Sequence, residues 1–159
     1  MKATPIAKIP ALILDNGEVL IDSPVICAYL DSLNDKPVLI SKLGPQRWRD
    51  LTAEAVADGL MDVTVALYME KFVRHPKDFN EAFVKAQEET IGRALEAWEN
   101  EVNAFKNLSI ASIATACALG YLNFRLPELN PKGQYPKLQA WFEEFSRRPS
   151  LAQTLPVAT

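Results

Sequence analysis

The chain has 159 residues, of which 48% are hydrophobic and 23% charged, and its formal net charge is −3. This composition is typical of a folded globular protein and excludes disordered, collagen-like and coiled-coil chains. The negative net charge argues against nucleic acid as a partner. The sequence has neither a signal peptide nor an apolar run near the ~18 residues of a transmembrane helix, so we expect a cytoplasmic protein with no membrane partner.

Cysteine and histidine are too sparse for most metal and nucleophilic sites. The two cysteines, Cys27 and Cys117, each stand alone in an apolar stretch, and His75 is the single histidine. We therefore predict no metal, and no Ser–His–Asp or Cys–His catalytic system within the chain. Both cysteines are predicted to be buried, inert thiols, and His75 to lie in a surface loop.

The first 21 residues predict a β-hairpin. Residues 8–14 are apolar and partly β-branched, and residues 18–21 form a second such run. Between them, Asn16 and Gly17 form a turn signal because both residue types tolerate positive φ. A two-stranded hairpin is marginally stable alone, so we expect it to join a sheet or be covered by a helix.

A helix is predicted over residues 23–33. Asp22 and Ser23 can cap its free N–H groups, and Pro24 suits the first helical position. Its apolar residues recur every three or four positions. Residues 34–37, which include Pro37, are predicted to end it.

A long helix is predicted from Pro45 to about Arg74, with two apolar stripes. One contains Trp48, Leu51, Ala55, Leu60, Val63 and Leu67, and the other contains Met61, Val65, Tyr68 and Phe72. Two stripes indicate burial on two sides. The second side could contact a partner chain or lie inside a helical bundle, and the sequence leaves both open.

Three further helices are predicted. One spans about 79–105, and a second begins after Ser109 and is rich in alanine, which indicates a buried central helix. Ser109 is its predicted N-cap, whereas Ser112 is expected to reach back poorly because serine is shorter than the usual acidic partner. After a rigid loop that contains Pro131, a final helix is predicted over about 136–148.

These elements predict an α+β protein in three parts. Residues 1–34 form a hairpin plus one helix, residues 35–44 a linker, and residues 45–159 an all-helical domain. The first part would have an unpaired strand edge, which folded proteins normally protect.

Residues 4–12 (TPIAKIPAL) and 20–30 (LIDSPVICAYL) resemble the end of the thioredoxin-like domain of cytosolic glutathione S-transferases, and two later segments follow in that family's order. Residues 57–62 (ADGLMD) are similar to the first helix of the helical domain in a bacterial subgroup. Residues 108–125 resemble the family's buried folding-motif helix, although Ser112 stands where many members have Asp. The resemblance implies a partial thioredoxin-like unit followed by a helical bundle of the transferase C-terminal type.

The resemblance also implies that the chain is truncated at its N-terminus. Family members have a strand–helix–strand unit upstream that carries the catalytic Tyr, Ser or Cys. No residue of this chain inherits that role. The full-length protein would conjugate the glutathione thiolate to small electrophiles, whereas this chain is expected to be inactive. The alternative is a non-catalytic dimeric scaffold with the same fold.

Five residues are candidates for binding glutathione as a substrate. By the resemblance, Ile9 and Pro10 are joined by a cis bond, and the Ile9 backbone pairs with the ligand backbone; a plain strand start is the alternative. Asp22 and Ser23 at a helix start suit an ammonium and a carboxylate, although capping alone also explains them. Lys8 could reach the glycyl carboxylate or be merely solvated.

The resemblance further implies a homodimer, formed through the helix at 23–33 and the helix that starts at 45. Tyr68, Tyr121 and Phe124 could line an apolar pocket for the second substrate, although aromatic residues at helical spacing also suit a plain core.

Overall fold

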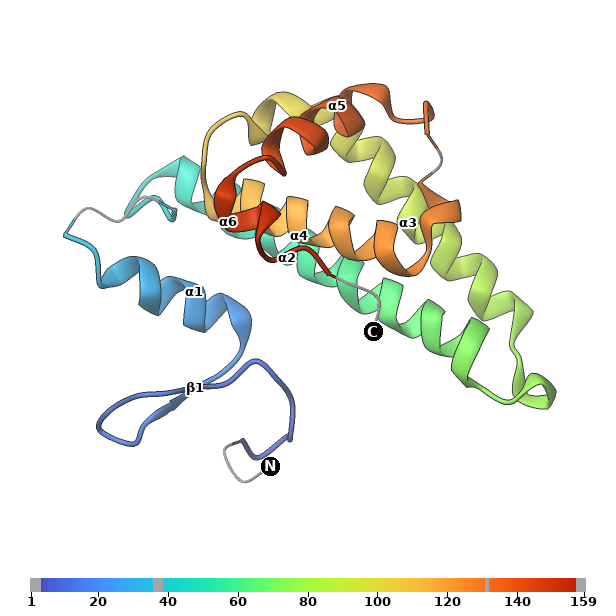
Figure 1. Ribbon diagram of the computed structural model, residues 1–159, viewed down its shortest axis with the longest axis horizontal. Helices are drawn as coiled ribbons and strands as arrows, with labels where there is room; N and C mark the ends of the chain where they lie inside the picture. Colours follow the sequence, from blue (N-terminus) through green and yellow to red (C-terminus); the bar gives the residue numbers. More distant parts are fainter. Residues whose placement is uncertain (1–3, 36–38, 131, 157–159) are drawn as a thin grey trace.

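The computed structural model describes residues 4–35, 39–130 and 132–156 (Figure 1). A small hairpin and one helix lie at one side of a larger helical bundle, as the sequence predicts. Lys36, Pro37 and Pro131, which were predicted to end a helix and to stiffen a loop, lie outside the described residues.

The hairpin is shorter than the predicted strands. Strand β1 (Leu12–Ile13) pairs antiparallel with β2 (Val19–Leu20), Leu12 opposite Leu20. Gly17 in the turn has φ +87°, a conformation that glycine adopts without steric cost. The strands stop early because β1 and β2 pair only with each other among the described residues, and short isolated hairpins gain little from extension.

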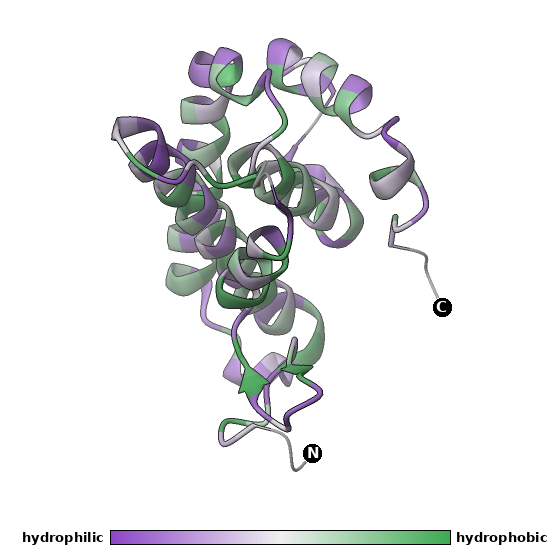
Figure 2. Cartoon of the chain, turned by 90° about the vertical axis from the view of Figure 1, so that its left-hand side faces the viewer, coloured by the Kyte–Doolittle hydropathy of each residue, from purple (hydrophilic) through white to green (hydrophobic). Residues whose placement is uncertain are grey.

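Helix α1 (Ser23–Ser32) follows β2 directly. Asp22 is its N-cap and accepts a hydrogen bond from the Ser23 N–H, with Pro24 in the first turn. The predicted helix start is therefore confirmed. Parts of the hairpin and of α1 are hydrophobic (Figure 2). In and beside these elements, the exposed apolar side chains include Ile9, Ile13, Val25 and Leu33.

Helix α2 (Pro45–Tyr68) continues as the π-helical turn η1 (Met69–Val73), so the predicted end near Arg74 is confirmed. Only one side of α2 is buried by the chain itself, in a line through Ala57, Leu60, Thr64 and Leu67. Trp48, predicted on a buried stripe, is 66% exposed. The predicted helical period of α2 is correct, but the buried face of the helix is rotated from the predicted stripe. Asp50 and Glu54 also lie on this buried face.

A short 3-10 turn, η2 (Pro76–Asp78), connects to α3 (Glu81–Glu101), which ends in the 3-10 turn η3 (Val102–Phe105). Asn80 caps α3 by accepting from the Phe83 N–H at 3.0 Å. The side of α3 that faces the core carries Ile91, Leu95 and Trp98, all buried.

Helix α4 (Ile110–Arg125) is the central helix, as predicted, and packs mainly on α2. Ser109 caps it, accepting from the Ser112 N–H at 3.3 Å. Contrary to expectation, Ser112 reaches back: its Oγ accepts from the Ser109 N–H at 2.9 Å, which completes a capping box. Serine suffices because Ser112 is fully buried and its Oγ also donates to the Ser109 carbonyl at 3.0 Å.

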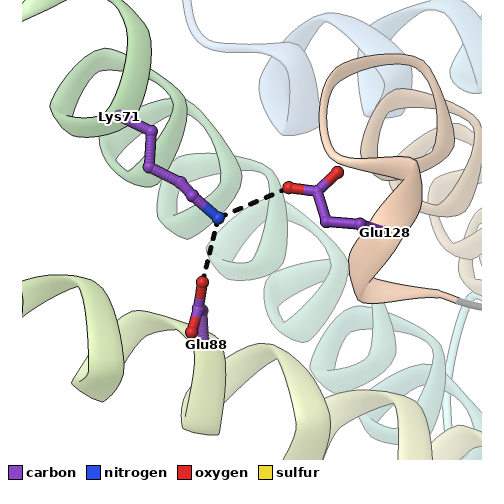
Figure 3. A network of polar contacts seen from close by, with 3 residues as sticks. All are labelled: Lys71, Glu88 and Glu128. Carbon is purple, nitrogen blue, oxygen red and sulfur yellow. Dashed lines mark hydrogen bonds and ion pairs between the residues drawn. The ribbon is translucent and has the colours of Figure 1, made fainter.

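The chain ends in η4 (Pro127–Leu129), α5 (Pro136–Phe145) and α6 (Pro149–Ala152). The predicted final helix over about 136–148 corresponds to α5, which ends three residues earlier at Phe145, and the short helix α6 follows from Pro149. Figure 3 shows how Lys71 of η1 forms ion pairs with residues of α3 and η4 and so connects these three elements. Its Nζ lies 3.0 Å from Glu88 of α3 and 3.4 Å from Glu128 of η4.

Candidate functional site

One pocket collects all five predicted binding residues. It has a volume of about 220 Å³, and Lys8, Ile9, Pro10, Asp22 and Ser23 all line it. The hairpin makes this possible, because it returns the chain from the Ile9–Pro10 segment to the start of α1. Their roles toward glutathione stay predictions.

Local backbone geometry shapes this pocket. The Ile9–Pro10 bond is cis, as the family resemblance implied, and the Ile21–Asp22 bond is also cis. Ile9 is 88% exposed, so its backbone and side chain face open space. The Ser23 hydroxyl lies 3.2 Å from Asp22 Oδ1, to which it donates. This contact fits the capping explanation and still leaves the other Asp22 oxygen for a ligand.

Helix α2 adds three residues that sequence reasoning missed. Asp58, Met61 and Asp62 line the pocket opposite the hairpin. Burial raises the pKa of the Asp58 carboxyl, and the charges of Asp22 and Asp62 raise it further. The spacing of Asp58 and Asp62 places them on one helix face, but nothing local in the sequence shows that this face meets α1. Together the three carboxylates make this end of the pocket suited to a cation.

A second, mostly apolar pocket adjoins the first and shares Met61 with it. Its volume is about 290 Å³, and its wall includes Cys117, Tyr121, Phe142 and Leu155. Of the three aromatic residues predicted to line a co-substrate pocket, Tyr121 lies here. The Tyr68 and Phe124 rings instead lie around the guanidinium of Arg125, at 4.8 and 4.9 Å.

The two cysteines are less buried than predicted. Cys117 is exposed, because it turns from α4 toward the second pocket, and Cys27 of α1 is partly buried. Partial removal of each sulfur from water raises the pKa of both thiols, for Cys117 on the wall of the apolar pocket, and the charge of nearby Asp58 raises both further. Both cysteines are therefore mainly protonated thiols at neutral pH, and the thiolate is the reactive form. His75 is exposed, as predicted.

Other classes of site lack support in the described ranges. No three His, Cys, Asp or Glu side chains there gather closely enough to hold a metal ion. Within the same ranges, no helix combines the length and apolar character needed to cross a bilayer.

Family models match most of the chain. Residues 1–33 match the glutathione S-transferase N-terminal domain, and residues 56–149 match the C-terminal domain. The "Uncharacterized GST-like protein YibF" of Escherichia coli K12 is 33% identical over 156 residues, which cover 96% of this chain and 77% of that protein.

Solved structures agree with the family models. A glutathione transferase family member from Pseudomonas fluorescens Pf-5, with bound glutathione, is 44% identical with a TM-score of 0.93, over 99% of this chain and 78% of that one. Its structure with bound S-(propanoic acid)-glutathione is equally similar and is covered to 82%. The hairpin and α1 thus lie within the match to the family's N-terminal domain, and the match to its C-terminal domain runs from within α2 to the first residue of α6. The chain belongs to the glutathione S-transferase family.

Proposed function

We propose that the chain is part of a transferase that conjugates the glutathione thiolate to small electrophiles, and that it supplies part of the glutathione site. The observation that carries this proposal is the convergence of Lys8, Ile9, Pro10, Asp22 and Ser23 on one pocket. A relative that is 44% identical binds glutathione.

The chemistry of the pocket suits the γ-glutamyl group. The start of α1 offers free N–H groups and the positive end of a helix dipole to a carboxylate. Asp22, Asp58 and Asp62 offer negative charge to the ammonium beside it. The exposed Ile9 backbone can pair with the extended peptide as a strand would. In this proposal the hydroxyl or thiol that lowers the thiol pKa comes from outside these 159 residues.

Calorimetry with glutathione tests this assignment. We expect weak binding that Asp22→Ala and Ser23→Ala each reduce several-fold, since each removes a polar contact. Asp35→Ala is the matched control, because Asp35 is an exposed carboxylate beyond the other end of α1. Binding that both pocket variants leave unchanged would place glutathione elsewhere.

Conjugation by the 159-residue chain alone is expected to be negligible, since none of the predicted site residues activates a thiol. Turnover of a generic aromatic electrophile well above the uncatalysed rate would contradict the assignment of the activating group to another segment.

We also propose that the protein acts as a cytoplasmic homodimer. A groove of about 430 Å³ between α2 and α3 is lined by Trp48, Val56, Trp98 and Phe105. Trp48 and Val56 are exposed in this groove. Large apolar residues that are exposed in a single chain often become buried at an interface with a second copy. Two free cysteines fit a reducing compartment.

The same groove favours the second candidate, a dimeric scaffold without catalysis. The two candidates differ in ligand binding: a scaffold would dimerise with no affinity for glutathione, whereas a transferase needs both.

A further inference from the structure

Arg125, the last residue of α4, has its guanidinium in an aromatic surrounding. Its central carbon lies 4.8 Å from the centroid of the Tyr68 ring, 4.9 Å from that of Phe124 and 5.7 Å from that of Tyr121. Aromatic faces attract a cation, so these rings hold the guanidinium in a defined place.

The guanidinium has no anionic partner in the described part of the chain. Its Nε is buried there without a hydrogen-bond acceptor. The carboxylates on neighbouring turns are engaged elsewhere: Glu70 lies 2.7 Å from Arg74, and Glu128 contacts Lys71 (Figure 3). A buried donor without an acceptor is costly, and the terminal nitrogens of a guanidinium can hold a carboxylate with two hydrogen bonds.

Arg125 lies one turn of α4 beyond Tyr121, which lines the apolar pocket next to the proposed glutathione pocket. Met61 lines both pockets, and Tyr68 follows it by two turns on the same face of α2. On α4, Cys117 and Tyr121 line the apolar pocket, and Arg125 follows them at the same four-residue spacing. The Tyr121 ring thus has the apolar pocket on one side and the guanidinium near it.

We propose that Arg125 determines specificity by binding a carboxylate on the electrophile, and on the S-substituent of the resulting glutathione conjugate. The inference rests on the proposed function. An apolar wall that ends in one unpaired cation suits a ligand with an apolar body and an anionic end. The relative from Pseudomonas fluorescens binds a conjugate of this class, since S-(propanoic acid)-glutathione carries a carboxylate on its S-substituent.

A purely structural role is the competing explanation. A cation in the last turn of a helix interacts favourably with the helix dipole, and stacking on three rings adds to packing. That role would stabilise α4 but would give no preference between anionic and neutral ligands, so ligand selectivity separates the two explanations.

A pair of fluorescent probes tests selectivity without glutathione. 8-Anilinonaphthalene-1-sulfonate and N-phenyl-1-naphthylamine share one apolar body, and only the first carries an anionic group. We expect Arg125→Met to weaken binding of the sulfonate about tenfold while changing that of the neutral probe less than about twofold. Arg125→Lys should retain part of the preference, because it keeps the charge and loses the two-bond geometry.

Arg148→Met is the matched control, because the Arg148 guanidinium also stacks on a ring, that of Phe145 at 5.0 Å, and lines a different pocket. It should leave both probes unchanged. Equal weakening of both probes by Arg125→Met, or no change in either, would overturn the proposal. Thermal unfolding of each variant shows whether it is folded. If Arg125→Met does not fold, the probe measurements on Arg125→Lys decide the test.

Calorimetry then separates this inference from the proposed function. The ligands are glutathione, S-(propanoic acid)-glutathione and the amide of that conjugate. We expect Arg125→Met to weaken the acid conjugate about tenfold and the other two little. Suppose that glutathione and its conjugates do not bind, but that the preference for the sulfonate probe over the neutral probe depends on Arg125. The proposed function then fails, and the anion-binding role of Arg125 stands. If glutathione binds and the acid and amide conjugates are equivalent in the wild-type chain, the subsite fails alone.

Discussion

Asp31 ties the end of α1 to the segment that leads into the helical bundle. Its carboxylate is buried and accepts from the Leu39 N–H at 3.1 Å and the Ile40 N–H at 3.0 Å. The Leu39 carbonyl in turn accepts from the Ile110 N–H at 2.9 Å. One buried side chain therefore helps to join α1 to the start of α4.

Asp31→Ala is expected to lower the free energy of unfolding by about 2–3 kcal/mol, because it leaves two N–H groups without their charged acceptor. Urea unfolding measures the change. Asp35→Ala, at an exposed site just after α1, should stay within about 0.5 kcal/mol of the wild type. Equal effects of the two variants would show that the Asp31 hydrogen bonds contribute nothing.

Single residues also show where sequence reasoning reaches its limit. Asp22 and Ser23 were found because capping and ligand binding at a helix start depend on residues a few positions apart. Asp58 was missed because its role depends on α2 meeting α1, a contact between segments far apart in the chain. Arg125 was missed for the same reason, since its aromatic neighbours come from α2 as well as α4.

At the scale of elements, the start of α4 depends on two serines that cap each other. Ser109→Ala and Ser112→Ala are each expected to cost about 1 kcal/mol, since each removes one side chain of the box. The double variant should cost less than the sum, because the two residues act as one unit. Urea midpoints of the four proteins give the coupling. Strict additivity would mean that the two hydrogen bonds are independent.

A carboxylate from α3 holds the start of α5. Glu99 accepts from the Lys137 N–H at 3.2 Å and the Leu138 N–H at 2.7 Å, where α5 has no capping side chain of its own. Glu99→Ala should cost about 1 kcal/mol by loss of these bonds and of the favourable charge at a helix start. Glu96→Ala, one turn earlier and exposed, is the control and should be near neutral in the same unfolding assay.

Most helices were predictable because each has local signals. Pro45 and Pro136 mark two starts, and Ser109 marks a third. The π-helical end of α2 was not predictable, because a change from four- to five-residue hydrogen bonding leaves the apolar pattern almost unaltered. The rotation of α2 was misjudged since polar Thr64 lies on its buried side, where it donates to the Leu60 carbonyl.

At the scale of the whole molecule, we expect the dimer to use the exposed groove between α2 and α3 in addition to the interface through α1 and α2 that the family resemblance implies. Trp48→Glu is expected to shift the protein from two chains to one at micromolar concentration, because an aromatic residue at the centre of an interface often contributes 2 kcal/mol or more. Light scattering measures the mass. Phe79→Glu, at an exposed apolar residue outside the groove, should leave the mass unchanged. A wild-type chain that is already a monomer would refute the dimer itself.

Several carboxylates lie close together at the junction between α1 and the bundle. Glu54 is buried on α2, one turn before Asp58, and its charge raises the pKa of the Cys27 thiol on α1. Burial raises the pKa of Glu54 itself, and the Asp58 charge raises it further. The folded protein therefore holds a proton on Glu54 more tightly than the unfolded chain does. The resulting stability is fully present below the unfolded pKa and is lost as pH rises through the folded pKa.

Glu54→Gln removes this cost, so the variant should be more stable than the wild type at pH 7.5. Relief of the repulsion with Asp58 alone accounts for about 0.2–0.5 kcal/mol, and relief of the buried charge adds to it. The difference in urea midpoint should shrink toward pH 4, where Glu54 is protonated in the folded wild type. Glu89→Gln, at an exposed site on α3, should show no such pH dependence. A Glu54→Gln variant that is less stable than the wild type at pH 7.5 would contradict this prediction. It would mean that the ionised Glu54 carboxylate makes a favourable contact across the junction and helps to hold α1 to the bundle.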